Sequence, residues 1–408
     1  MKKKFSIYMV NGVERLLTPA LLEAIQYFPA VSLVGPRQVG KTTLAHHLAA
    51  GLPKPTLYLD LERTEDQARL GDRPAWLLEQ YTDHTVVLDE IQRMPQLFPQ
   101  LRALIDDHRV PGRFILLGSA SPDLLAQSGE TLAGRICFLE LTPFLRTEVA
   151  DTPYQTHWFR GGFPEPFLMD SDRIRTQWYR SFIQSYVERD LPLLGKLGVS
   201  VTASLLSRLL RMLTTIQGAL LNYSMLAGSL GVSVTTVRNY IDLLEEAFIV
   251  RRLEPYFVNI GKRLTKSPKF YLRDSGLLHH LLNLASPDAL LLHAQVGASW
   301  EGYVIEQIIN QLADNVTPYF YRTQQGAELD LVLVRGNAPI LAVEVKLSNS
   351  PTLSRGVTIA QEDMGGVPLL VVTPSAGDYP FRPGIRVVDI NTIWPRLAAE
   401  GLLRTAPN

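Results

Sequence analysis

Residues 35–42 constrain this chain most, because they match the pattern Gly-x-x-x-x-Gly-Lys-Ser/Thr. In this pattern the glycines let backbone N–H groups face phosphate oxygens, the lysine reaches the β- and γ-phosphates, and the hydroxyl can bind Mg²⁺. Residues 30–34 predict the preceding strand and residues 42–50 the following helix. The sequence therefore predicts a nucleoside triphosphate site with Mg²⁺, rather than a glycine turn without a ligand. The expected binding residues are Gly35, Pro36, Arg37, Gln38, Val39, Gly40, Lys41, Thr42 and Thr43.

The composition limits the number of domains, the binding partners and the cellular location that this chain can have. The chain has 408 residues, enough for two or three domains. Its 40 Lys and Arg balance its 40 Asp and Glu, so binding to nucleic acid or membrane would need a local patch of charge. Cys137 is the single cysteine, which excludes an intramolecular disulfide and a thiolate metal cluster. No apolar run is long enough to cross a bilayer, and we expect a soluble, cytoplasmic protein.

The first 145 residues alternate between strand and helix patterns. Short apolar runs typical of buried strands recur, and the residues between them, such as 97–105, have helical spacing. This alternation predicts an α/β domain over residues 1–145, with a parallel sheet covered by helices on both faces. The expected strands are residues 30–34, 56–59, 85–88, 114–117 and 136–141.

Two acids follow the expected strand at residues 85–88. Asp89 and Glu90 would lie at the carboxyl edge of the sheet, beside the phosphate loop. There Asp89 would hold Mg²⁺ through water, and Glu90 would polarise the water that attacks the γ-phosphate. A solvated Asp-Glu loop is the alternative, but the buried strand before the pair favours the catalytic interpretation.

Ser119 and Arg135 are further candidates for the same chemistry. Ser119 follows the next strand and would reach the γ-phosphate or the attacking water. The alternative for this segment is a helix N-cap, and both can hold if Ser121 caps the helix. Arg135 precedes the last strand and would act as an arginine finger supplied by a neighbouring subunit, unless it is a plain surface charge. An arginine finger in trans predicts a homo-oligomer, for instance a ring.

These motifs resemble those of AAA+ type ATPases of bacteria and archaea whose C-terminal region is a domain of unknown function with a restriction-endonuclease-like appearance. The resemblance covers the chain from Ala30 to Lys346. It implies a P-loop NTPase sheet and ATP rather than GTP, and the guanine-reading Asn-Lys-x-Asp motif is absent. The matching segments are residues 35–42, 88–92, 118–121, 132–135, 161–165 and 270–277.

The middle of the chain predicts two helical units. Residues 146–200 are expected to form a lid or connector, because apolar residues recur there at helical spacing. Residues 201–285 predict a winged helix-turn-helix, in which Gly231 makes the turn and Ser233 caps the second helix. We expect it to contact DNA mainly through the phosphate backbone, and a protein-binding module is the alternative. The expected DNA-binding residues are Arg238, Lys262, Arg263, Lys266 and Lys269.

Residues 290–408 predict an α/β domain of restriction-endonuclease-like type. Along residues 327–334 the two-residue period of a strand places Glu328 and Asp330 on one face. The same period places Leu329, Leu331 and Leu333 on the other face. A turn then leads to residues 340–347, where Glu344 and Lys346 share a face and would meet Asp330 if the register matches.

This pattern is the Asp and Glu-x-Lys set of the restriction-endonuclease-like superfamily. Asp330 and Glu344 would hold Mg²⁺, Glu301 from the preceding helix would add a ligand, and Lys346 would stabilise an attacking hydroxide. The fold also occurs as a binding or scaffolding module without catalysis.

Three functions follow from the sequence. The first is an ATP-hydrolysing AAA+ type protein, associated with DNA, that couples nucleotide state to the winged helix and the nuclease-like domain. The second is an ATP-gated, Mg²⁺-dependent DNA nuclease. The third is a nucleotide-controlled switch that recruits proteins without touching DNA.

Overall fold

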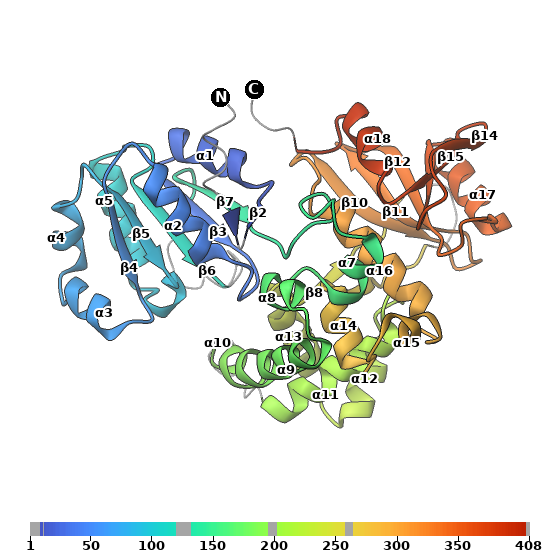
Figure 1. The fold of residues 1–408 in the computed structure, drawn as a ribbon, viewed down its shortest axis with the longest axis horizontal. Coiled ribbons are helices and arrows are strands. Elements are labelled where there is room, and N and C mark those ends of the chain that lie inside the picture. The colour runs from blue at the N-terminus through green and yellow to red at the C-terminus, as the bar shows by residue number, and fades with distance from the viewer. Residues whose placement is uncertain (1–8, 11, 120–131, 195–201, 258–263, 405–408) are drawn as a thin grey trace.

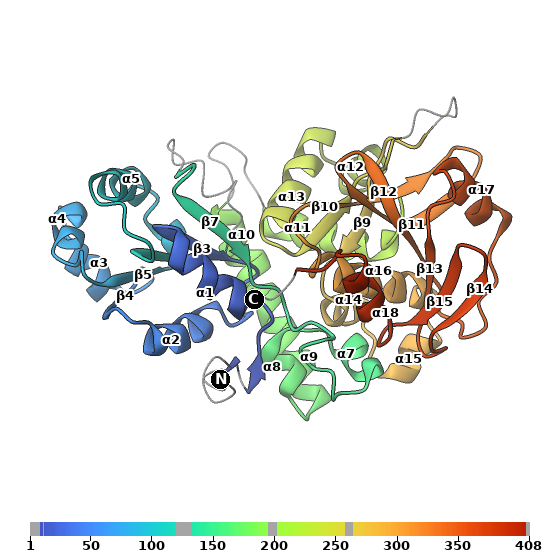
Figure 2. The ribbon, with the colours of Figure 1, turned by 90° about the horizontal axis from the view of Figure 1, so that it is seen from above.

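The computed structural model describes residues 9–10, 12–119, 132–194, 202–257 and 264–404. Figure 1 shows three lobes: an N-terminal sheet domain in blue and cyan, a helical lobe in green and yellow, and a C-terminal sheet domain in orange and red. Seen from above in Figure 2, the two sheets lie at opposite ends of the molecule. In the described part of the chain, no helix is both long and apolar enough to cross a membrane.

The N-terminal domain contains the predicted parallel sheet. Its strand order is β4-β5-β6-β3-β7, and every neighbouring pair in it is parallel. The three central strands are buried along their whole length, which explains why they read as apolar runs. The strands are β3 (Ala30–Val34), β4 (Thr56–Asp60), β5 (Thr85–Asp89), β6 (Phe114–Gly118) and β7 (Ile136–Glu140). The helices are α1 (Thr18–Tyr27), α2 (Lys41–Gly51), α3 (Thr64–Leu70), α4 (Pro74–Glu79), η2 (Ile91–Arg93) and α5 (Leu97–Asp107). A short hairpin of β1 (Met9–Val10) and β2 (Val13–Glu14) precedes them.

Helices follow directly after the sheet. The helix α9 (Asp172–Phe182) runs without a break into a π-helical segment, η4 (Ile183–Asp190), and then into α10 (Leu191–Leu194). Long π-helical runs are rare, and π-bulges are frequent at functional sites. The shorter helices α7 (Tyr154–Arg160) and α8 (Pro164–Leu168) precede them.

A second helical unit follows, with three α-helices before a hairpin and two shorter ones after it. Gly231, in the left-handed conformation at φ 71°, ends α12, and the Ser233 side chain caps α13 by accepting a hydrogen bond from the Thr236 amide at 3.0 Å. These two positions are the ones that the sequence predicted. The elements are α11 (Ala203–Leu213), η5 (Thr214–Ile216), α12 (Tyr223–Leu230), α13 (Val234–Glu246), β8 (Val250–Leu253), β9 (Lys269–Leu272), α14 (Ser275–Leu281) and α15 (Pro287–Leu291).

The C-terminal domain is a mixed sheet with helices on both faces. Its strand order is β10-β11-β12-β13-β15-β14, and the pairs β12-β13 and β13-β15 are parallel. The helices α16 and α18 pack on one face and α17 on the other. The elements are α16 (Val296–Ile309), β10 (Val316–Arg322), β11 (Glu328–Arg335), β12 (Ala338–Val345), α17 (Arg355–Asp363), β13 (Leu369–Thr373), β14 (Tyr379–Arg382), β15 (Ile385–Asp389) and α18 (Ile393–Ala399).

A bulge in β11 corrects the predicted side-chain alternation. Tyr319 pairs with Val332 and Tyr321 with Leu329, so the single residue Phe320 opposes two residues of β11, Asp330 and Leu331. The predicted shared face for Leu329, Leu331 and Leu333 is therefore wrong: Leu329 packs with the α17 core, the other two with the α16 core. A bulge changes the direction of the side chains beside it.

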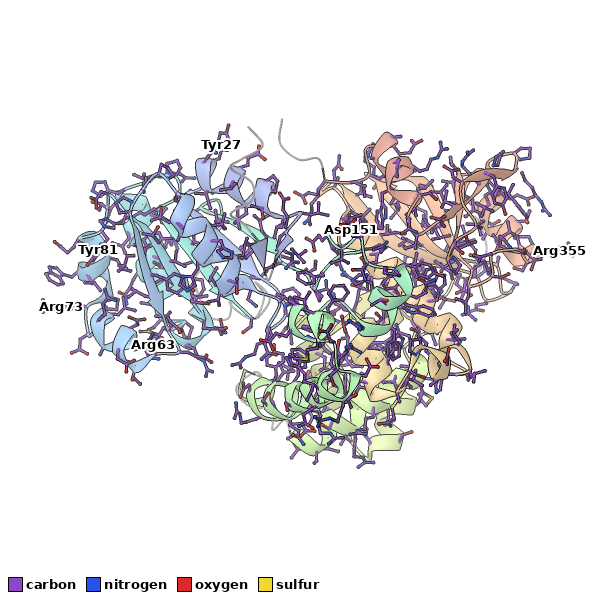
Figure 3. The ribbon with its side chains drawn as sticks, viewed as in Figure 1. Tyr27, Arg63, Arg73, Tyr81, Asp151 and Arg355 are labelled. Carbon is purple, nitrogen blue, oxygen red and sulfur yellow. The ribbon has the colours of Figure 1, made fainter. Side chains whose placement is uncertain are left out.

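Charged side chains cover the outer surfaces of the lobes. Figure 3 labels Arg63 and Arg73 on the N-terminal lobe and Arg355 on the C-terminal lobe, and all three are exposed. This scatter agrees with the balance of charges in the sequence. Some charged side chains are buried, among them Lys41 and Lys269.

Candidate functional site

The phosphate loop connects β3 to α2 at the carboxyl edge of the first sheet. Gly35 has φ 141°, and a Cβ atom there would lie 2.2 Å from the Leu141 carbonyl oxygen, so only glycine fits. Gly40 has φ 94° and precedes the first turn of α2. The two glycines of the motif are thus required by the backbone path, and the loop ends at a helix N-terminus, where anions bind favourably.

Lys41 folds back over its own loop. Its Nζ donates to the carbonyl oxygens of Gly35 at 2.9 Å and Pro36 at 2.7 Å, and its side chain is buried. Burial lowers the pKa of Lys41 to about 8, although Glu90 and Asp89 act in the opposite direction. Neutral carbonyls, not carboxylates, hold the ammonium, so phosphate oxygens can replace them without breaking an ion pair.

Thr42 and Asp89 meet beneath the loop. The Thr42 hydroxyl donates to Asp89 Oδ2 at 2.8 Å, and the Tyr58 hydroxyl donates to the same oxygen at 2.5 Å. A hydroxyl and one carboxylate suit Mg²⁺, which keeps waters and takes its remaining ligands from phosphate. The described residues contain no group of three or more His, Cys, Asp or Glu side chains that could hold a metal ion.

Glu90 is held in place at the neighbouring strand end. It adopts the left-handed conformation at φ 53°, which is uncommon for a residue with a Cβ atom and is found at functional sites. Its Oε2 accepts from the Ser119 hydroxyl at 3.0 Å and from the Gln92 amide. Gln92 Nε2 also contacts Ser119 Oγ at 3.0 Å. Strands β5 and β6 thus bring Glu90 and Ser119 together.

The π-helical segment η4 contacts this site at two points. Arg37 of the phosphate loop pairs with Asp190, and its guanidinium lies 5.9 Å from the Tyr186 ring centre. The Tyr186 hydroxyl donates to the Ser119 carbonyl oxygen at 3.2 Å. The loop and the end of β6 therefore both contact the helical lobe.

Sequence reasoning did not single out four residues of this site, Tyr58, Gln92, Tyr186 and Asp190. Tyr58 and Gln92 had usable signals, since β4 ends at the same sheet edge as β5 and Gln92 lies within the matching segment 88–92. The contacts of Tyr186 and Asp190 span 67 and 153 residues and have no local pattern.

Arg135 lies at the opposite edge of the sheet. The Ala30 amide donates to its carbonyl oxygen at 3.2 Å, at the start of β3, whereas the phosphate loop follows the end of β3. Its guanidinium pairs with Asp106 at 2.6 and 2.8 Å. Arg135 therefore does not reach the phosphate loop of its own chain, and the expectation that it serves a neighbouring subunit stays a prediction.

The four predicted nuclease residues come together in the C-terminal domain, with an unpredicted lysine among them. Lys346 Nζ pairs with Glu344 Oε1 at 2.6 Å, and Asp330 Oδ2 accepts from the Val345 amide at 3.0 Å. Burial, followed by the nearby Asp330, raises the pKa of Glu301 to about 7 and that of Glu344 to about 8. Between Glu301 and Asp330 lies the ammonium group of Lys269, 3.1 Å from each carboxylate.

Lys269 is a correction to the predicted DNA surface. It was placed at an exposed basic tip, but its side chain is 2% exposed, because β9 packs against the C-terminal domain. Arg238 and Lys266 are exposed, and the Arg238 guanidinium lies 4.8 Å from the Tyr223 ring centre. Lys262 and Arg263 lie outside the described residues.

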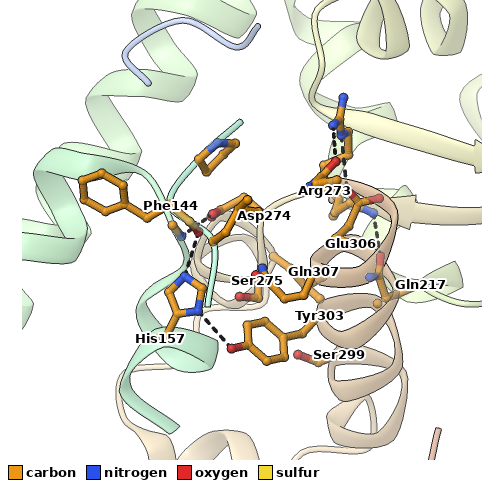
Figure 4. A pocket seen from close by; sticks show the side chains of 17 residues that line it. Phe144, His157, Gln217, Arg273, Asp274, Ser275, Ser299, Tyr303, Glu306 and Gln307 are labelled. Carbon is orange, nitrogen blue, oxygen red and sulfur yellow. Dashed lines mark hydrogen bonds and ion pairs between the residues drawn. The ribbon is translucent and has the colours of Figure 1, made fainter. Parts of the chain in front are cut away.

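A small cavity at the junction of the lobes does not resemble a nucleotide site (Figure 4). Its volume is about 20 Å³, room for one water molecule. His157 Nε2 donates to the Phe144 carbonyl oxygen and Nδ1 accepts from the Tyr303 hydroxyl, both at 2.9 Å. Burial lowers the pKa of His157 to about 4, so the ring is neutral. Arg273 ties β7 to α16 there through Glu140 at 2.5 Å and Glu306 at 3.2 Å.

Comparison with protein families agrees with this architecture. Residues 27–150 match an AAA domain, residues 151–288 a domain of unknown function (DUF8612), and residues 296–393 another (DUF4143). With the parallel sheet and the phosphate loop, the first match defines an AAA-type P-loop ATPase domain.

Two mycobacterial proteins are similar over nearly the whole chain. They are the uncharacterised proteins Rv2008c of Mycobacterium tuberculosis and Mb2031c of Mycobacterium bovis, each 39% identical over 383 residues, which cover 94% of this chain and 85% of theirs. The chain belongs to the same protein family as these two.

Solved structures show weaker likeness. The Walker-type ATPase PABY2304 of Pyrococcus abyssi is 13% identical, with a TM-score of 0.44 over 66% of this chain and 96% of its own. AMPPCP-bound DnaA of Aquifex aeolicus is 13% identical, with a TM-score of 0.28 over 60% of this chain and 92% of its own. At these TM-scores the likeness does not define a shared fold over the whole chain.

Proposed function

We propose that this protein binds and hydrolyses ATP at the edge of its N-terminal sheet. One observation carries the proposal: Lys41, Thr42, Asp89 and Glu90 lie together around a loop that ends at a helix N-terminus. Binding of phosphate, binding of Mg²⁺ and activation of water each have a residue of suitable chemistry there.

Each residue has a separate task in this proposal. Lys41 leaves the two carbonyls for the β- and γ-phosphate oxygens, and Thr42 and Asp89 hold Mg²⁺. Bound Mg²⁺ neutralises charge that develops on the phosphates. Glu90 orients the attacking water, while Ser119 and Gln92 fix the direction of its carboxylate.

Nucleotide state would reach the helical lobe through Arg37. Its partners Asp190 and Glu62 are carboxylates, at 15% and 40% side-chain exposure, and a triphosphate in the loop would compete with them for the guanidinium. Release of Asp190 would loosen the contact between the loop and η4. We therefore expect η4 to move between nucleotide-bound and nucleotide-free states.

The test of hydrolysis is Lys41→Ala. Without the ammonium, turnover should fall by about 1000-fold or more, because a cation on the transferring phosphoryl group is worth that much. Phosphate release at saturating ATP measures it. Lys54→Ala is the matched control, since Lys54 Nζ lies on the same domain and donates to the Pro111 carbonyl, away from the phosphate loop. Unchanged turnover in Lys41→Ala would refute the site.

We propose DNA as the partner of the helix-turn-helix formed by α12 and α13. The support is the arrangement of three helices and a hairpin, with exposed Arg238 on α13 and exposed Lys266 before β9. Arg238→Ala with Lys266→Ala should lower the salt dependence of DNA binding by about two counterions. Asp288→Asn on α15 is a control of similar exposure. If binding or its salt slope does not change, DNA contact lies elsewhere and the protein-recruiting switch gains support.

Arg135 would complete the site of a neighbouring subunit in an oligomer. Mixing Arg135→Ala with Lys41→Ala protein tests this, since mixed assemblies would regain turnover that neither variant has alone. If mixed assemblies recover no turnover, Arg135 has no part in the mechanism.

Metal-dependent cleavage by the C-terminal domain is not proposed, because Lys269 lies among its carboxylates.

A further inference from the structure

The Lys269 ammonium is surrounded by three carboxylates. Its Nζ lies 2.7 Å from Glu328 Oε1, 3.1 Å from Glu301 Oε1 and 3.1 Å from Asp330 Oδ1. An ammonium has three N–H donors and no acceptor, so the three oxygens match its donors one to one. The Phe320 ring centre lies 5.8 Å from Nζ and closes another side.

Two features of the fold bring the ammonium to this position. Lys269 is the first residue of β9, and two residues further on Tyr271 donates to Glu301 Oε1 at 2.6 Å, so the strand period places two donors on one side. The bulge in β11 lies opposite Phe320 of β10, where Asp330 leaves the regular alternation. Both partners of the contact are therefore set by strand geometry.

Backbone pairing holds the hairpin against the C-terminal sheet on the chain segments that follow β8 and precede β9. After β8, the Phe320 amide donates to the Glu254 carbonyl at 3.0 Å and the Tyr256 amide to the Phe320 carbonyl at 2.7 Å. Before β9, the Thr265 amide donates to the Arg322 carbonyl at 3.0 Å. With the backbone held in this way, any other rotamer of Lys269 would leave its buried ammonium without a partner, which is costly.

A divalent ion does not fit this arrangement. Mg²⁺ would need oxygens at about 2.0 to 2.1 Å in octahedral geometry. Glu301 and Asp330, two of its three expected ligands, each already accept from the ammonium. Glu344 pairs with Lys346 through Oε1, and its buried Oε2 is a single unpaired oxygen, too few for an octahedral ion. The described residues accordingly contain no group of three or more such side chains able to hold a metal.

We propose that Lys269 is the resident cation of this acidic cluster, in place of a metal ion, and that it fastens the β8-β9 hairpin to the C-terminal domain. The hairpin supplies one positive charge, and α16 and β11 supply the carboxylates. The C-terminal domain then works without a divalent metal. This inference does not depend on ATP hydrolysis at the first domain.

The test compares metal binding by the full-length protein without nucleotide. Mn²⁺ is titrated into wild type, Asp330→Asn and Lys269→Ala, and bound Mn²⁺ is followed by loss of the free-ion electron paramagnetic resonance signal, with melting temperature recorded in parallel. Wild type and Asp330→Asn should bind the same amount of Mn²⁺, because the cluster of the wild-type protein holds none. Lys269→Ala empties the centre of the cluster, so it should melt at a lower temperature and gain one Mn²⁺ site that also raises its melting temperature.

Lys266→Ala is the matched control, because Lys266 precedes β9 by three residues and is exposed. It should melt and bind Mn²⁺ as wild type does. Wild-type Mn²⁺ binding that Asp330→Asn abolishes would overturn the proposal, as would a folded Lys269→Ala with unchanged melting and no new site. If Lys269→Ala does not fold, the comparison of wild type with Asp330→Asn alone decides.

Discussion

The two acidic sites of this molecule differ in what their carboxylates contact. At the nucleotide site, Asp89 accepts from the hydroxyls of Thr42 and Tyr58, and neutral groups also hold Glu90. In the C-terminal cluster, Glu301 and Asp330 contact the ammonium of Lys269. Neutral donors can yield to an incoming cation, whereas an ammonium already neutralises its partners. Under the two proposals above, similar carboxylate chemistry would give one site that accepts Mg²⁺ and another that excludes it.

The two buried lysines offer the largest contrast in stability. Lys269→Ala leaves three carboxylates without their cation and should cost about 3–5 kcal/mol, the range for removing one partner of a buried ion pair. Lys41 donates to two backbone carbonyls and forms no ion pair among the described residues, so Lys41→Ala should cost far less. Melting temperatures of the two variants, measured side by side without nucleotide, test this. Equal losses would mean that the two lysines are held alike.

The two aspartates offer the next contrast, in activity. Asp89→Asn should lower ATP turnover by about 100-fold or more, because Mg²⁺ loses its carboxylate anchor. Asp330→Asn should keep ATP turnover within about twofold of wild type, because Asp330 and its partner Lys269 lie outside the N-terminal domain that holds Asp89. Phosphate release under identical conditions measures both. A large loss of turnover in Asp330→Asn would show that the cluster communicates with the nucleotide site.

The smallest expected effect concerns Tyr58. Its hydroxyl shares Asp89 Oδ2 with Thr42, and burial followed by Asp89 raises the pKa of this phenol, so it stays a donor. Tyr58→Phe should change the Mg²⁺ dependence of turnover by about two- to fivefold, the value of one hydrogen bond, and leave the maximal rate nearly unchanged. A Mg²⁺ titration of ATPase activity measures this, and Tyr81→Phe is the control on the same domain. A fall in the maximal rate instead would give Tyr58 a role in the chemical step.

The sequence predicted those features that local patterns encode. The phosphate loop, the parallel sheet, the acids after β5 and the cap at Ser233 each depend on residues close together along the chain. Such patterns suffice because strand ends and helix starts have few local solutions.

Features that depend on distant segments were missed or misjudged. Lys269 and Asp330 are 61 residues apart, and no periodicity relates them. The bulge opposite Phe320 breaks the two-residue period at the point where the period was used to assign faces. A lysine in a basic run also looks exposed by composition, and only the packing of β9 shows that it is buried.

The contact of Lys269 also bears on how far the parts of this chain are modular. The family boundaries place Lys269 within residues 151–288 and its carboxylate partners within residues 296–393. A fragment made of the last domain alone would carry the negative charges without the positive one. Its solubility and folding would then depend on salt or on a borrowed cation. The ion cluster around Lys269 therefore crosses the boundary between the two family matches.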